Sequence, residues 1–247
     1  MHYGLFNSCC TPRRCVKDSP DIIIVMKQPE VVILIPAYNE ATVIASVIGE
    51  IFIRHKLPII VIDDGSDDDT STEATRAGAI VLRHAINRGK GAAIKTGIAA
   101  AHELNAKAII TFDADGQHDP RDIETLIKGL KDGYDVVLGV RDQKKMPFIK
   151  QIANTIGNIA TLLFYGLWVH DSQCGLRAFS QKAYERITTQ NERYEYESEV
   201  IRDIVRHKLK YVEVPVKTTY TSYSQSKKHK QNFVNGIRTI IHMFISS

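Results

Sequence analysis

The chain has 247 residues, of which 44% are hydrophobic and 24% charged, and its formal net charge is +4. This composition is ordinary for a globular protein, and the length suffices for one large domain or two small ones. No long Lys/Arg run is interleaved with aromatic residues, and the net charge is small. Composition and charge therefore argue against a nucleic-acid-binding protein.

Residues 1–29 are polar and irregular, and we expect them to form a flexible N-terminal extension. The segment contains Cys9, Cys10 and Cys15, whose spacing matches no common zinc site. Free thiols indicate a reducing compartment. The first twenty residues contain no apolar core of a signal peptide.

Apolar strand patterns and helical patterns alternate five times between residues 31 and 139. We expect strands at 31–36, 58–63, 79–83, 107–113 and 135–139, and helices at 40–54, 66–76 (capped by Ser66), 89–104 and 120–131. Each strand is apolar on both faces, which is typical of a parallel sheet covered by helices. Polar clusters follow the strands, and ligands of such sheets bind beyond the carboxyl ends of the strands. The pattern therefore predicts one composite site.

The second half of the chain has a different character. Residues 151–170 contain no Asp, Glu, Lys or Arg, and their spacing fits either an amphipathic helix in a membrane interface or a buried core helix. We expect a strand at 176–180, a helix at 195–209 and a strand at 211–216. Residues 221–247 read as a basic turn followed by an amphipathic helix. No stretch has the apolar length of about twenty residues that a membrane span requires.

The turn after the fourth predicted strand has the residue types of a metal site. Asp113 and Asp115 can present their carboxylates together at the end of a strand, with the amide oxygen of Gln117 in reach. Such oxygens suit a hard divalent cation, Mg²⁺ or Mn²⁺. The alternative is a polar turn that caps the next helix.

Five motifs in this order resemble family 2 glycosyltransferases, which are inverting enzymes with the GT-A fold. They occupy residues 36–40, 63–70, 87–91, 113–120 and 139–141. Residues 171–179 resemble the branch of dolichol-phosphate mannose and glucose synthases, which glycosylate polyprenyl phosphates. The resemblance implies a Rossmann-like, mostly parallel α/β sheet flanked by helices, with a C-terminal acceptor-side extension of helices and strands. It places the catalytic domain at 30–220, with a nucleotide-sugar half at 30–141 and an acceptor half at 142–220.

The resemblance also implies roles for individual residues. The nucleotide sugar would contact Pro36, Tyr38, Glu40, Ile62, Asp64, Asp113, Ala114, Asp115 and Arg141. Asp115 and Arg141 would be catalytic, Asp113, Asp115 and Gln117 would hold the metal, and Arg177 and Lys227 would hold the acceptor phosphate, with Arg88 as a further candidate.

Simpler structural roles exist for several of these residues. The acidic side chain of Glu40 can be stabilised by the dipole at the N-terminus of a helix. Asp64 can belong to a turn, and Arg141 can form a surface ion pair. Asp63 can brace its turn, and Lys90 can pair with Asp113 or contact the donor.

The implied reaction is metal-dependent transfer of a sugar, with inversion, from a UDP-sugar or GDP-mannose to a polyprenyl phosphate. A phosphate acceptor is already ionised and needs positive charge rather than a general base. The enzyme would be cytoplasmic and peripherally attached to the membrane surface, and no nucleic acid is involved. Residues 220–227 depart from the family pattern, because they lack the Arg and Gly found near the Lys227 position in related synthases.

Three other functions stay open at this stage. A glycan, protein or small-molecule hydroxyl can be the acceptor, with Asp171 as the base. A sugar-phosphate nucleotidyltransferase uses a similar sheet and metal, and a non-catalytic nucleotide-sugar-binding module has the same fold.

Overall fold

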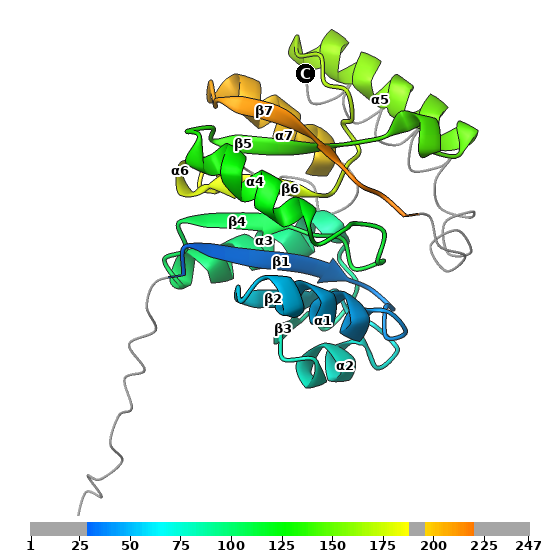
Figure 1. The fold of residues 1–247 in the computed structure, drawn as a ribbon, viewed down its shortest axis with the longest axis vertical. Coiled ribbons are helices and arrows are strands. Elements are labelled where there is room, and N and C mark those ends of the chain that lie inside the picture. The colour runs from blue at the N-terminus through cyan, green and yellow to red at the C-terminus, as the bar shows by residue number, and fades with distance from the viewer. Residues whose placement is uncertain (1–28, 188–195, 220–247) are drawn as a thin grey trace, which may run out of the picture.

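The computed structural model describes residues 29–187 and 196–219, which form one seven-stranded sheet with helices on both faces (Figure 1). The strand order is β3-β2-β1-β4-β6-β5-β7. The strands are β1 (Val31–Ala37), β2 (Ile59–Asp63), β3 (Ile80–Arg83), β4 (Ala108–Thr111), β5 (Val136–Arg141), β6 (Arg177–Ser180) and β7 (Tyr211–Val216). Strand β6 is antiparallel to both of its neighbours, and the other pairs are parallel. The predicted mostly parallel α/β fold is confirmed.

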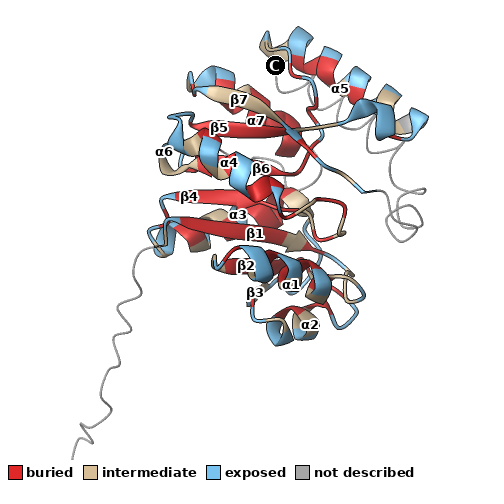
Figure 2. Cartoon of the chain, viewed as in Figure 1, coloured by how far each residue is buried: buried red, intermediate tan, exposed pale blue. Residues whose placement is uncertain are grey.

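Two apolar cores, one on each face of the sheet, hold the layers together. The helices are α1 (Ile44–Arg54), α2 (Thr70–Arg76), α3 (Lys90–Glu103), α4 (Asp122–Lys131), α5 (Phe148–Tyr165), α6 (Gln181–Tyr184) and α7 (Tyr196–Arg206), with the 3-10 turn η1 (Gln143–Lys145) before α5. Helices α1, α2 and α4 contribute to the first core, and α3, α6 and α7 to the second. Figure 2 shows the central strands as buried along most of their length.

The sequence did not predict the strand order. Strand β6, from the second half of the chain, lies between β4 and β5, which are consecutive strands in the first half. The two proposed halves therefore share one sheet. Local apolar patterns mark strands but contain no information on which strands pair, so the sequence made no prediction of the strand order.

The exposure of strand β3 and the start of helix α2 both differ from what the sequence predicted. Strand β3 is an edge strand with exposed and half-buried residues, and Ile80 is 45% exposed. Helix α2 begins at Thr70 rather than at Ser66, because Ser66 is engaged elsewhere. The Ser66 hydroxyl accepts a hydrogen bond from the backbone of Asn39 (2.9 Å).

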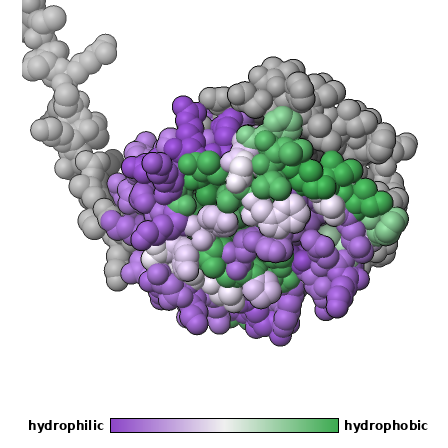
Figure 3. Space-filling view, turned by 90° about the horizontal axis from the view of Figure 1, so that it is seen from above, coloured by the Kyte–Doolittle hydropathy of each residue, from purple (hydrophilic) through white to green (hydrophobic). Residues whose placement is uncertain are grey.

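Helix α5 packs on the body of the protein through its polar side. Asn154, Asn158 and Thr161 are buried, whereas Phe148 and Leu163 are exposed. Figure 3, which looks onto the end of the molecule where α5 lies, shows a band of apolar residues. The helix ends at Tyr165, and the next residue, Gly166, adopts the left-handed conformation (φ 69°) common after a helix C-terminus. The buried-core alternative is therefore wrong for this segment. Across residues 29–187 and 196–219, no helix combines the length and apolarity that crossing a membrane requires.

Candidate active site

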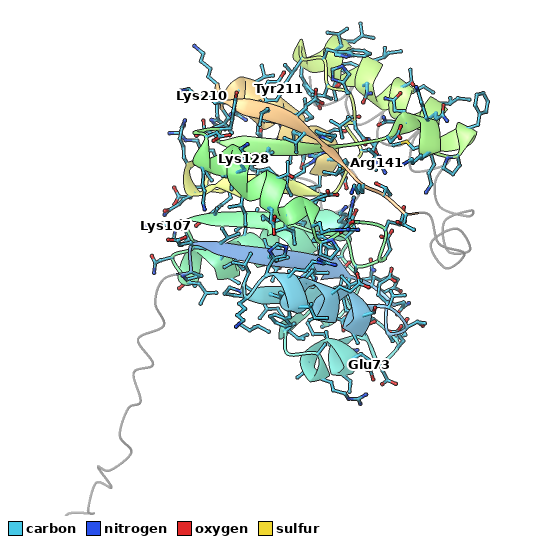
Figure 4. The ribbon with its side chains drawn as sticks, in the orientation of Figure 1. Glu73, Lys107, Lys128, Arg141, Lys210 and Tyr211 are labelled. Atoms are coloured by element: carbon cyan, nitrogen blue, oxygen red, sulfur yellow. The ribbon has the colours of Figure 1, made fainter. Side chains whose placement is uncertain are left out.

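The polar loops lie at the edge of the sheet where the parallel strands end. Figure 4 shows Arg141 at this edge, whereas Lys107 and Lys210 lie at the opposite edge. The loops after β1, β2 and β4 belong to the same edge because these strands are parallel neighbours. The predicted composite site therefore has a common location in the fold.

The loops after β1 and β2 are joined by direct hydrogen bonds. Asn39 has a positive φ of 55°, an uncommon conformation for a residue other than glycine. Its side-chain oxygen accepts a bond from the backbone of Asp67 (2.8 Å), and the Glu40 backbone donates to Thr70 (2.8 Å). These bonds fix the backbone on the C-terminal side of Tyr38, whose side chain is 41% exposed.

Pro36 and Glu40 complete the first loop. Pro36 is half-buried at the end of β1, and Glu40 is half-buried before α1. The Glu40 carbonyl accepts bonds from the backbones of Val43 (3.0 Å) and Ile44 (2.9 Å), so Glu40 lies at the N-terminus of α1, where the helix-dipole alternative expected it. A contact with the nucleotide sugar stays a prediction for Pro36, Tyr38 and Glu40.

The adjacent aspartates Asp63 and Asp64 organise the loops around them. Asp63 accepts a bond from the Ser66 backbone (2.9 Å) and one from the Ser71 hydroxyl, so it braces the turn as one alternative expected. Asp64 accepts bonds from the backbones of Arg88 (3.0 Å) and Gly89 (2.6 Å). The Asp64 carboxylate also contacts Nδ1 of His84 at 2.7 Å. The motif at 87–91 is thus held against the loop after β2 by Asp64.

Two predicted contacts with the nucleotide are limited by burial. The side chain of Ile62 is 0% exposed and packs in the core beside Leu34, and Ala114 is 4% exposed. Their side chains cannot reach a ligand in this conformation, because the surrounding core covers them. Only their backbone groups remain available for the predicted contacts.

Asp113 is the centre of a half-buried charge network. Its Oδ1 accepts from Nζ of Lys90 (2.8 Å), and its Oδ2 contacts Nε2 of His118 (3.2 Å). The same Lys90 ammonium lies 2.8 Å from Oε1 of Glu197. Burial alone would raise the pKa of Asp113, but the Lys90 charge and the His118 contact hold it well below its usual value. Burial alone would lower the pKa of Lys90, and the charges of Asp113 and Glu197 raise it instead. Asp113 is therefore ionised and Lys90 is charged.

Asp115 and Gln117 lie two residues further along the same loop. The Asp115 carboxylate accepts from the backbone of Gln117 (3.1 Å) and from its side-chain amide. No group of three or more His, Cys, Asp or Glu side chains suited to a metal occurs in the part of the chain that is described. Mg²⁺ is commonly held by one or two carboxylates together with substrate phosphates rather than by a complete protein cage. Two carboxylates with an amide oxygen fit that arrangement.

Arg141 ends β5 and forms a two-pronged ion pair with Asp171. Its Nε lies 2.7 Å from Oδ2 of Asp171, and its Nη2 lies 2.8 Å from Oδ1. The Arg141 backbone also donates to Asp171 (3.0 Å). The Asp171 side chain is 0% exposed and that of Arg141 is 16% exposed. An ion pair was one alternative for Arg141, but this pair is largely buried rather than on the surface.

The acceptor-phosphate prediction for Arg177 requires correction. Arg177 is 1% exposed, and its guanidinium donates to three backbone carbonyls, those of Ser172 (2.7 Å), Cys174 (2.9 Å) and Glu197 (3.0 Å). It fixes the turn at 172–175 against the start of α7 and does not face an acceptor. Arg88 is exposed, and Lys227 lies outside the described residues.

We predict that Arg177→Met lowers the free energy of unfolding by about 3–5 kcal/mol, because buried carbonyls lose their donors. Arg177→Lys should recover only part of this loss, since one ammonium cannot span three carbonyls. Urea unfolding followed by circular dichroism measures both variants. Unchanged stability of Arg177→Met with a raised KM for the acceptor would restore the phosphate-binding role.

Sequence reasoning missed Glu197 and His118. Glu197 lies in the first turn of α7, 107 residues after its partner Lys90, and nothing local marks that pairing. His118 had a visible signal, because it is inside the motif at 113–120 and directly follows Gln117.

The chain matches the family described as glycosyl transferase family 2 over residues 32–188, more than half of its length. It belongs to this family and is an enzyme, as the motifs predicted. It is 41% identical over 228 residues to an uncharacterized protein of Methanocaldococcus jannaschii, with 89% of this chain and 93% of that protein covered.

A second relative has a named activity. UDP-N-acetylglucosamine–dolichyl-phosphate N-acetylglucosaminyltransferase of Methanococcus voltae is 36% identical over 220 residues, which cover 79% of this chain and 88% of that enzyme. The similarity supports the expected polyprenyl-phosphate branch.

The fold is also similar to a solved structure. Glucosyl-3-phosphoglycerate synthase from Mycobacterium tuberculosis, in complex with Mn²⁺ and UDP-glucose, superposes with a TM-score of 0.70. The identity is 19%, with 88% of this chain and 78% of that chain covered. This likeness supports the GT-A fold.

Proposed function

We propose that the enzyme transfers one sugar from a UDP-sugar to a polyprenyl phosphate, with inversion at the anomeric carbon and with Mg²⁺ or Mn²⁺. The bond from the anomeric carbon to the β-phosphate oxygen breaks, a bond to an acceptor phosphate oxygen forms, and UDP leaves. The Methanococcus voltae relative supports this choice, because its name specifies UDP-N-acetylglucosamine and dolichyl phosphate.

The choice of acceptor rests on one observation, which is that the Asp171 carboxylate is buried and bound to Arg141. A hydroxyl acceptor requires a general base, and Asp171 was the candidate. Both of its oxygens are bound to Arg141, and its side chain is 0% exposed. A phosphate acceptor needs no such base, because its second pKa is about 6. The pairing therefore favours phosphate over hydroxyl.

The donor end would be held at the loop after β4. Asp113, Asp115 and Gln117 would hold a divalent cation, which neutralises charge on the departing diphosphate. Lys90 is positively charged and lies 2.8 Å from both Asp113 and Glu197, so it would fix the Asp113 carboxylate in position for the cation. Arg141 would orient the diphosphate from the end of β5, with Asp171 fixing its guanidinium.

The acceptor's apolar chain stays in a bilayer, so the reaction would occur at a membrane surface with the enzyme peripherally attached. We propose the cytoplasmic face because Cys174, the cysteine within the described residues, is a free, buried thiol, and free thiols are typical of a reducing compartment.

The test uses purified protein, membrane extract, Mg²⁺ or Mn²⁺ and a panel of radiolabelled nucleotide sugars that includes GDP-mannose. Label from a UDP-sugar should enter an organic-soluble product that mild acid releases. Label found only in water-soluble or protein fractions would contradict the proposal, and label from GDP-mannose alone would correct the donor.

A further inference from the structure

Glu197 contacts the candidate metal loop indirectly, although it lies outside every motif of the sequence. It is in the first turn of α7, and its Oε1 lies 2.8 Å from the ammonium of Lys90, the first residue of α3. The same ammonium lies 2.8 Å from Oδ1 of Asp113. One positive charge is therefore shared between a candidate metal ligand and a carboxylate on another helix.

The Glu197 carboxylate is held firmly beside Lys90. Its side chain is 8% exposed, compared with 21% for Lys90 and 28% for Asp113. The backbone carbonyl of Glu197 accepts a hydrogen bond from Nη1 of the buried Arg177 (3.0 Å). Charges in such partly buried positions are screened by salt much less than charges on the surface. The negative charge of Glu197 therefore acts on Lys90 at close range.

The balance of charge around Asp113 determines how well a cation can bind there. The pKa of Asp113 is held well below its usual value and that of Lys90 is raised, so both groups are charged. Without Glu197, Asp113 and Lys90 would have no net charge, and the ammonium would repel a cation. With Glu197, the three groups have one net negative charge. Glu197 therefore offsets the cost of placing a lysine next to a candidate metal ligand.

We propose that Glu197 is a positioning residue for the candidate metal site and that it acts through Lys90. Its carboxylate neutralises the Lys90 ammonium and so leaves the charge of Asp113 available to a divalent cation. This inference rests on the proposed function, because it assumes that Asp113 binds the cation. Two other roles are possible for Glu197, that of a direct metal ligand and that of a purely structural ion pair, and the experiment separates all three.

The first variant is Glu197→Gln, which keeps the shape and an acceptor oxygen but removes the charge. The affinity of the full chain for Mn²⁺ with saturating UDP, measured by electron paramagnetic resonance, should fall about tenfold or more, because one charge near a divalent ion has at least that effect. The Mn²⁺ concentration that gives half-maximal transfer should rise by the same factor, with a rate at saturating Mn²⁺ within about threefold of the wild type. Glu197→Asp, which keeps the charge, should retain most of the affinity.

A double variant separates an action through Lys90 from a direct contact with the metal. Glu197→Gln with Lys90→Gln removes one charge of each sign, so the net charge around Asp113 is that of the wild type, and the new amide at position 90 can still donate to Asp113. The affinity for Mn²⁺ should return to within about threefold of the wild type, because the two changes are coupled. Glu199→Gln is the matched control, because Glu199 is in the same turn of α7 but pairs with Arg202 (3.6 Å).

Circular dichroism establishes that each variant is folded before the titration. Mn²⁺ affinity of Glu197→Gln equal to that of the wild type, with only a lower unfolding temperature, would overturn the inference in favour of a structural ion pair and leave the proposed function intact. A double variant as weak as Glu197→Gln would overturn it in favour of a direct ligand, and an equal loss in Glu199→Gln would overturn it as a general effect of charge on α7. A wild type that binds no Mn²⁺ would refute the metal dependence of the proposed function and this inference together.

Discussion

Asp115→Asn is expected to reduce sugar transfer by about 10²–10³-fold while the fold is retained. The reason is that Asp115 lies in the loop after β4 beside Gln117 and would supply one of two carboxylates to the cation. Loss of that charge leaves the departing diphosphate poorly neutralised. Steady-state rates at saturating donor measure the effect.

Binding gives a second readout that is independent of turnover. Mn²⁺ and UDP together should raise the unfolding temperature of the wild type, because a ligand stabilises the state it binds. Asp115→Asn should show a much smaller rise. Asp119→Asn is the control, since Asp119 is in the same loop but pairs with Arg121. Full activity of Asp115→Asn, or an equal loss in both variants, would refute the metal role of Asp115.

Gly175→Ala is expected to disrupt the same candidate metal site by displacing the other carboxylate, that of Asp113. A Cβ at this position would lie 2.3 Å from Oδ2 and 2.5 Å from Oδ1 of Asp113. Such distances are far inside van der Waals contact, so the carboxylate must move away from Lys90 and His118. We expect a loss of activity of about 10²-fold or more, since one displaced charge at the diphosphate has an effect of that order.

Gly49→Ala is the matched control for Gly175→Ala. Gly49 lies in α1, and an added Cβ there meets no atom within 4 Å. It should leave activity unchanged, because alanine is favourable in a helix. Affinity for Mn²⁺, measured by electron paramagnetic resonance, should fall only in Gly175→Ala. Unchanged affinity in that variant would show that Asp113 does not serve the metal.

The fold was predictable where residues act locally. Strands such as Val31–Ala37 are continuous apolar runs, and their parallel arrangement follows from the alternation with helices. The insertion of β6 was not predictable, because pairing of Arg177–Ser180 with β4 and β5 depends on contacts distant in sequence. The reversed polarity of α5 also depends on its partner, the turn at 170–172, rather than on its own pattern.

The candidate site shows the same division. Asp113, Asp115 and Gln117 share one loop, as the motif predicted, and their role as metal ligands stays a prediction. Arg177 has the charge expected of a phosphate-binding residue, but the three carbonyls around it are visible only in the folded chain. Glu197 was not predicted, because its partner Lys90 is on a different helix and the sequence around Glu197 does not indicate that they pair.

The central claim is that the acceptor atom is a phosphate oxygen of a polyprenyl phosphate. Its most direct test incubates purified enzyme and UDP-N-acetylglucosamine with synthetic polyprenyl phosphate or with the matching polyprenol, and analyses the products by mass spectrometry. We predict equal amounts of UDP and of a polyprenyl phosphate carrying one sugar, and no product from the polyprenol. A product on the polyprenol, or release of UMP in place of UDP, would contradict the account.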